Sequence, residues 1–105
     1  MKIVGNLLCA PNYNYIHIDG DWSPDALYEP WAMFAVMDHT GGGSQRVRVK
    51  ASGMLAVRIK KLDPEKGDFV RIEGFSVAPM RGSVYVYAES FEILKRSKAE
   101  GKDDG

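Results

Sequence analysis

The sequence predicts a small all-β domain that contains one short helix. Several segments alternate apolar and polar residues, which is typical of half-buried strands. Only residues 53–62 space their apolar residues as a helix does. The chain has 105 residues, of which 45% are apolar, so it is long enough for one domain with one compact core.

The pattern of residues 2–30 predicts one strand, a short alternating segment and a loop. The strand runs over residues 2–10, with Gly5 as a bend or bulge, and Pro11 interrupts it. The segment YNYIHI at 13–18 alternates cleanly, which again indicates a strand. Residues 20–30 are expected to form a long acidic loop.

The middle of the chain predicts a hairpin of two strands, 31–38 and 46–51, joined by the flexible glycine-rich connection HTGGGSQ. The second strand alternates three cations with three apolar residues. A period of two places all three cations on one face of the sheet and the apolar side chains in the core. The cations are Arg46, Arg48 and Lys50.

The period then changes to that of a helix over residues 53–62. Its apolar face is formed by Leu55, Ile59 and Leu62. Ser52 or Gly53 would cap the start of this helix. Asp63 and Pro64 end it, because a residue that precedes proline is pushed out of helical backbone space.

The last third predicts two further strands and a tail. Residues 69–76 and 83–94 alternate, and VAPMRG between them is expected to be a loop. The polar end of the chain predicts a flexible charged tail at 96–105, so the folded domain would span residues 1–95. If residues 2–10 and 13–18 are counted as one strand that Pro11 interrupts, the order of elements is three strands, one helix and two strands. This is the order of the OB-fold, a five-stranded barrel with its helix between strands three and four.

Three segments resemble the bacterial and phage-type single-stranded-DNA-binding proteins. They are KIVGNL at 2–7, GMLAVRIKKLDPEKGDFVRIEG at 53–74 and VYVYAESFEIL at 84–94. The resemblance implies a divergent member with an OB-fold that binds and protects single-stranded DNA with little sequence preference. It also implies a role in replication, recombination or repair, and a homo-oligomer, either a dimer or a tetramer. Arg46 stands near a position where this family often has a tryptophan.

The chain has no net charge, but its charges are distributed unevenly. Residues 1–45 contain one cation and five acids, whereas residues 46–81 contain nine cations and four acids. The window 46–61 contains six cations and no acid. Because the local potential attracts a partner more than the total charge does, this distribution favours an anionic partner. A solvated strand and helix face would produce the same pattern.

Sequence-tolerant binding to single strands requires cations that follow the phosphates and exposed rings that stack on bases. The cationic strand meets the first requirement, and tyrosines that alternate with valines on the last strand meet the second. The predicted nucleic-acid-binding residues are Arg46, Arg48, Lys50, Tyr85, Tyr87, Tyr13, Tyr15, Arg71 and Trp31. The tyrosines of the last strand would serve equally well in an oligomer interface, and Trp31 also suits a core or rim position.

The alternative function on the same barrel is a protein–protein interaction or oligomerisation module of a replication complex, without strong DNA binding of its own. An enzyme is not expected, because His17 and His39 show no ligand pattern and HTGGGS lacks the lysine of a P-loop. We therefore expect no catalytic residues, metal, cofactor or small-molecule substrate. No apolar run approaches the roughly 18 residues of a membrane helix. The single cysteine, Cys9, suits a cytoplasmic location and is expected to be a small core residue.

Overall fold

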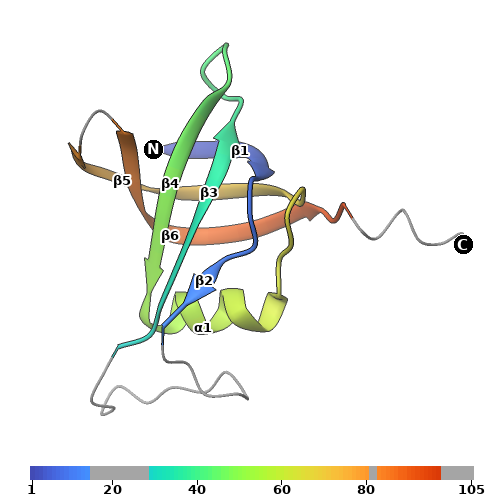
Figure 1. Ribbon diagram of the computed structural model, residues 1–105, viewed down its shortest axis with the longest axis vertical. Helices are drawn as coiled ribbons and strands as arrows, with labels where there is room; N and C mark the ends of the chain where they lie inside the picture. Colours follow the sequence, from blue (N-terminus) through green and yellow to red (C-terminus); the bar gives the residue numbers. More distant parts are fainter. Residues whose placement is uncertain (15–28, 81–82, 98–105) are drawn as a thin grey trace, which may run out of the picture.

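The computed structural model describes residues 1–14, 29–80 and 83–97 (Figure 1). Six strands and one helix lie within these ranges. In chain order they are β1 (Lys2–Leu7), β2 (Asn12–Tyr13), β3 (Trp31–Asp38), β4 (Gln45–Ser52), α1 (Gly53–Leu62), β5 (Phe69–Met80) and β6 (Ser83–Lys95). Most of the predicted YNYIHI strand, including Tyr15 and His17, lies outside the described residues, as do nearly all of the acidic loop and most of the tail.

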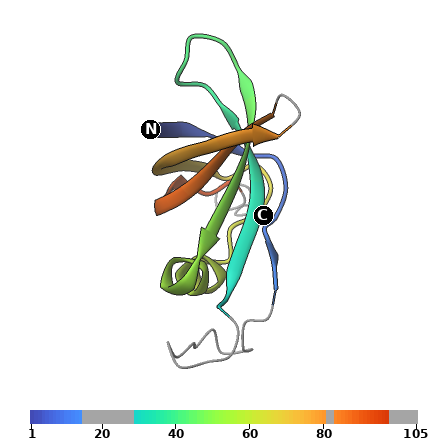
Figure 2. The ribbon, with the colours of Figure 1, turned by 90° about the vertical axis from the view of Figure 1, so that its left-hand side faces the viewer.

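The strands form one sheet in the order β1-β5-β6-β4-β3-β2, and an additional pairing of β1 with β3 closes five of them into a barrel. β4 and β6 run parallel, whereas the other pairs are antiparallel. The helix α1 follows β4 directly and lies across one end of the barrel (Figures 1 and 2). The predicted all-β class and the OB-fold are thereby confirmed.

The barrel core is filled by the inward faces of the strands and by one face of α1. In β4 the predicted alternation is confirmed, because Val47, Val49 and Ala51 are buried while Arg46 and Arg48 are exposed. The remaining core side chains are Ile3, Leu7, Phe34, Val36, Ile59, Val70, Ile72, Val86 and Phe91. Full burial of one such side chain contributes about 1.5–3 kcal/mol. The cations of β4 therefore project outward from a wall that the core holds rigidly in place.

Gly5 lies where β1 is paired along both edges, with Val70 of β5 and with Asp38 of β3. A Cβ atom at this position would lie 1.7 Å from the carbonyl oxygen of Met37. Only glycine allows the β3 backbone to approach so closely. The feature that the sequence marked as a bend or bulge is a close backbone contact, and it lies at the seam that closes the barrel.

The helix begins and ends where the sequence predicts. Ser52 is its extended N-cap residue, although its side chain makes no capping hydrogen bond. Ile59 is fully buried, and the other two predicted apolar residues are partly buried against the core. Asp63 adopts a left-handed conformation, with φ of 53°, and its amide donates to the carbonyl oxygen of Ile59. This conformation stops the helix directly before Pro64.

Two predicted boundaries are wrong. β1 ends at Leu7 rather than at residue 10, so the following residues leave the barrel wall. The segment VAPMRG is not a loop over its whole length, because β5 continues to Met80. Its backbone pairs with β6, which satisfies the polar groups that a loop would leave to water. We call residues 75–80 and 83–87 the β5–β6 arm.

Two residues of the predicted tail contact the domain. The amide of Ser97 donates to Oδ1 of Asp68 at 2.9 Å, and the amide of Glu65 donates to Oδ2 at 2.9 Å. Asp68 is 1% exposed, so these bonds satisfy a buried carboxylate. The guanidinium of Arg96 donates to the carbonyl oxygen of Leu62 at 2.6 Å, near the end of α1. Contacts with the barrel therefore continue as far as Ser97.

Candidate nucleic-acid interface

The outer face of the barrel carries two rows of side chains that run across the strands. Paired residues on neighbouring strands project to the same face of a sheet. The first row consists of Phe75, Tyr87, Lys50, Met33 and Asn12, from β5 through β6, β4 and β3 to β2. The second row consists of Val77, Tyr85, Arg48 and Ala35. The parallel pairing of β4 with β6 thus places the predicted cations directly beside the predicted tyrosines.

Aromatic rings and a cation are in contact along the first row. Phe75 and Tyr87 are stacked, with ring centroids 5.8 Å apart and an angle of 20° between the rings. Nζ of Lys50 lies 5.7 Å from the centroid of Tyr87 and 5.9 Å from that of Trp31. These are the separations of cation–π contacts. Tyr85 joins the cluster, since its centroid is 6.1 Å from that of Tyr87. Phe75 is 50% exposed, so this cluster offers an aromatic surface to a ligand.

The three predicted arginines differ in whether their charge is balanced, and Arg71 lies outside both rows, opposite Val4 and Glu92. Among the residues that the structure describes, the guanidinium groups of Arg46 and Arg48 have no hydrogen-bond or ion-pair partner. Arg71, in contrast, donates to Oε1 of Glu92 at 2.7 Å. That ion pair is exposed, so its contribution to stability is at most about 1 kcal/mol. It does reduce the positive field of Arg71 relative to that of Arg46 and Arg48.

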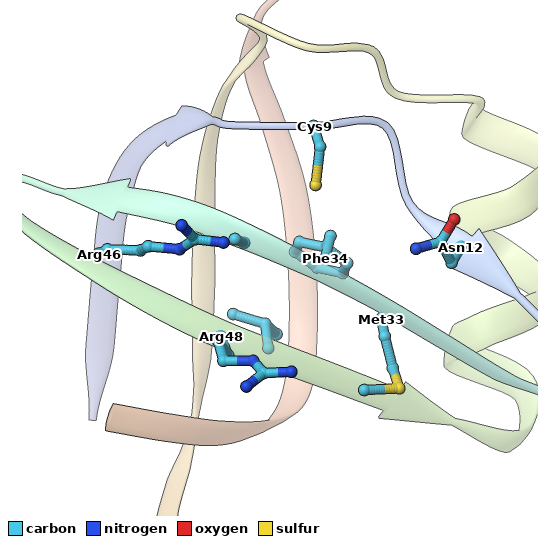
Figure 3. A pocket seen from close by; sticks show the side chains of 8 residues that line it. Cys9, Asn12, Met33, Phe34, Arg46 and Arg48 are labelled. Carbon is cyan, nitrogen blue, oxygen red and sulfur yellow. The ribbon is translucent and has the colours of Figure 1, made fainter. Parts of the chain in front are cut away.

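Arg46 and Arg48 also line a hollow of about 160 Å³ at the β2 end of the rows (Figure 3). The close view shows Cys9 above this hollow and Asn12 and Met33 at one side of it. The prediction that Cys9 is a core residue is wrong, because its side chain is exposed. Since β1 ends at Leu7, the chain has already left the barrel wall at this residue.

Tyr13 does not lie in either of the two rows on the outer face. Its backbone partner on β3 is Ala32, which is fully buried, and its ring packs against the core. Nζ of Lys60 lies 4.9 Å from the centroid of this ring. Burial raises the pKa of Tyr13 to about 12, with a smaller contribution from the carboxylate of Asp63. Tyr13 thus faces the opposite side of the wall from Asn12.

The buried hydroxyl of Tyr13 predicts an alkaline pH dependence of stability. Its oxygen has no hydrogen-bond partner among the described residues. Because its pKa is 10.0 ordinarily and about 12 in the fold, the unfolded chain loses this proton first, and stability falls between those pH values. Tyr13→Phe should lose less stability over this range than the wild type. At pH 8 it should be equally stable, or more stable by about 1 kcal/mol. Urea unfolding at each pH measures both effects.

The matched control for this comparison is Tyr85→Phe, which removes a hydroxyl from the outer face instead. It should follow the wild-type pH dependence. If the stability of Tyr13→Phe falls in parallel with that of the wild type from pH 10 to 12, the assigned role of Tyr13 is wrong.

The described part of the chain contains no cluster of side chains suited to a metal ion. No group of three or more His, Cys, Asp or Glu side chains there could hold a metal ion. The ring of His39 contacts Oγ of Ser44 at 3.0 Å and Oδ1 of Asn6 at 3.2 Å. These contacts link the two ends of the β3–β4 connection to each other and to β1. Within the same residues, no helix is long and apolar enough to cross a membrane.

Comparison with known proteins relates the chain to solved structures. No family model and no curated protein matches it. The SSB domain of a protein from Synechococcus sp. aligns with a TM-score of 0.66 and 17% identity, over 88% of this chain and 91% of that one. The chain has an SSB-like OB-fold. A deletion mutant of the single-stranded DNA binding protein from Thermus aquaticus aligns with a TM-score of 0.65 and 21% identity, over 92% of this chain. The aligned part is 41% of that longer chain.

The rows of this SSB-like barrel contain residues that the sequence analysis did not assign to binding. A period of two over residues 69–76 places Phe75 on the same face as Arg71, but it does not show which residue lies beside Phe75. The β5–β6 register, which shifts between Glu73 and Gly74, places Phe75 opposite Tyr87. Met33 and Asn12 had no signal of their own, because their role depends only on which strands are neighbours.

Proposed function

We propose that this chain binds single-stranded DNA with little sequence preference, across the outer face of the barrel. The observation that carries the proposal is the adjacency of partly exposed aromatic rings and cations on the outer face, where Arg46 and Arg48 have no ion-pair partner among the described residues. In this arrangement the rings stack on bases and the cations contact the phosphates between them. The stacking residues are Tyr87, Tyr85, Phe75 and Trp31, and the phosphate contacts are Arg46, Arg48 and Lys50.

The chemistry of the face suits single strands of any sequence. Each base has a flat face, so stacking on a ring contributes about 1–3 kcal/mol whichever base is present. In a duplex these faces are covered by neighbouring bases, so the protein's rings cannot stack on them and contribute little to the binding free energy. The SSB-domain names of the structural neighbours support the same reading. Such a module would protect strands that become exposed in replication, recombination or repair.

Titration of the protein with oligo-dT at a series of salt concentrations tests this function. The logarithm of the affinity should fall linearly with the logarithm of the salt concentration, with a slope of about −0.7 for each phosphate contacted. Three cations on three phosphates would give a slope of about −2 from this face. A duplex of equal length should bind more weakly. Absence of binding at low salt, or an affinity independent of salt, would contradict the proposal.

Removal of one central ring should weaken binding without unfolding the barrel. Tyr87→Ala should lose about 1–3 kcal/mol, which is roughly a fivefold to hundredfold loss of affinity for oligo-dT. Tyr87 is the best position because it contacts Phe75, Tyr85 and Lys50. Tyr87→Phe keeps the ring and serves as the control, with an affinity close to that of the wild type. Equal losses in both variants would show that the hydroxyl, and not stacking, matters.

A second candidate function is self-association through the β5–β6 arm. The contacts of β5 with the N-terminal strand end at Gly74, which exchanges backbone hydrogen bonds with Met1, so among the described residues β5 pairs beyond Gly74 only with β6. An unpaired strand edge can accept a strand from another chain. Phe75 would then be covered by the second copy. Sedimentation with and without oligo-dT distinguishes the candidates, because a stable oligomer that ignores the oligonucleotide favours this one.

A further inference from the structure

The hollow beside Arg46 and Arg48 lies at the far end of the first row from the aromatic cluster. The row leads from Phe75 on β5 to Asn12 on β2, which lines the hollow. Four strand spacings of about 4.8 Å separate these two residues, or about 19 Å in all. A nucleic-acid strand that crosses this face would therefore meet both the rings and the hollow.

The polar side chains around the hollow are mainly hydrogen-bond donors, and the rest of its lining is apolar. Arg46 and Arg48 contribute two guanidinium groups, and the side-chain amide of Asn12 adds two N–H donors. Among the residues that the structure describes, no carboxylate lines the hollow. A guanidinium fork matches the oxygen atoms of a phosphate better than a point charge does. The donor set therefore selects an anion with several oxygen atoms.

The size of the hollow fits one small group. Its volume of about 160 Å³ is below the roughly 300–1,000 Å³ of pockets that hold whole small molecules. It corresponds to about five water molecules at ~30 Å³ each. A phosphate group with part of its hydration shell fits this space.

We propose that one backbone phosphate of the bound strand occupies this hollow, held by Arg46, Arg48 and Asn12 with Cys9 beside it. The proposal rests on the proposed function and adds the path of the strand. The nucleic acid runs from the aromatic cluster across β4 and β3 to the segment between β1 and β2. Cys9 then marks the end of this path.

Cys9 is the single cysteine of the chain and its side chain is exposed, so its reactivity reports on the hollow directly. The rate of its reaction with 5,5′-dithiobis(2-nitrobenzoate) is measured with and without oligo-dT. With oligo-dT at about ten times its Kd, the hollow is free about a tenth of the time, so the reaction should slow about tenfold. Sodium chloride at equal ionic strength shows how much of the effect is due to salt alone.

A variant of the hollow tests the nature of the bound group. Asn12→Asp places a negative charge in the hollow without touching either arginine, and it should weaken the affinity for oligo-dT by about tenfold through repulsion of the phosphate. Ser90→Asp introduces the same charge at an exposed position of β6 outside both rows, and it should change the affinity far less.

The outcomes separate this proposal from the proposed function. If oligo-dT binds but Cys9 reacts at an unchanged rate, the strand does not cross the hollow and the proposal is overturned, while the proposed function stands. Equal effects of Asn12→Asp and Ser90→Asp also overturn it. If the wild type does not bind oligo-dT at any salt concentration, both the function and the path are wrong.

Discussion

Replacement of Arg46, Arg48 and Lys50 together by glutamate is expected to abolish binding to oligo-dT while the barrel stays folded. Each change turns an attraction for phosphate into a repulsion. The slope of the logarithm of affinity against the logarithm of salt concentration should become less steep by about 2. At ~0.1 M salt the variant should bind at least about a hundredfold more weakly than the wild type. Fluorescence anisotropy of a labelled oligo-dT measures the affinity. Circular dichroism should remain that of the wild type, because Arg46 and Arg48 are exposed and Lys50 is half-buried.

A second triple variant controls for net charge. Lys2, Arg58 and Lys66 are exposed residues outside both rows, on β1, on α1 and on the turn before β5. Their replacement by glutamate changes the total charge by the same amount. It should reduce the affinity only modestly, because exposed charges more than about 10 Å from the strand are screened at ~0.1 M salt. Equal losses in the two variants would show that total charge, and not the cationic face of β4, determines binding.

Gly5→Ala is expected to prevent stable folding. The added methyl carbon would lie 1.7 Å from a carbonyl oxygen of β3, so one of the two backbones must move. Movement there opens the β1–β3 pairing that closes the barrel. The expected loss is about 4 kcal/mol or more, which is comparable with the whole stability of a small domain. Urea unfolding followed by circular dichroism measures it.

Gly41→Ala provides the matched control for this substitution. Gly41 lies in the connection between β3 and β4, and an added Cβ atom there would meet nothing within 4 Å. The free energy of unfolding of the Gly41→Ala protein should stay within about 0.5 kcal/mol of that of the wild type. If Gly5→Ala is as stable as Gly41→Ala, the close contact at the seam does not limit closure of the barrel. A stable Gly5→Ala protein that no longer binds oligo-dT would show that closure serves the site rather than the fold.

Local patterns were sufficient for most of the fold. The alternation over Trp31–Asp38 and over Gln45–Ser52, and the change of period over Gly53–Leu62, each mark an element that the structure contains. The errors fall where local signals do not decide the outcome. Proline and glycine in VAPMRG indicated a loop, but pairing with β6 continues β5 as far as Met80. The end of β1 at Leu7 depends likewise on which backbone groups find partners, and those partners are distant in the sequence.

The candidate site was predictable in part. A period of two was enough to place Arg46 and Arg48 on the outer face of β4. It also placed Tyr85 and Tyr87 on the outer face of β6. The same reasoning made Tyr13 resemble these residues, although the structure packs its ring against the core. Alternation divides the residues of a strand between two faces. Only the position of that strand in the sheet decides which face meets solvent and which meets the core.

The sequence by itself determined the fold class, the place of the helix and the cationic face of β4, since all three follow from the spacing of residues along the chain. Only the tertiary structure decided that Arg48 lies beside Tyr85 and Lys50 beside Tyr87, because a parallel pairing joins strands that are separated in the sequence by α1 and β5. It also decided that Asn12 and Cys9 share a hollow with the arginines of β4. Spacing along the chain determines where a side chain points, whereas the register between distant strands determines which side chains it meets.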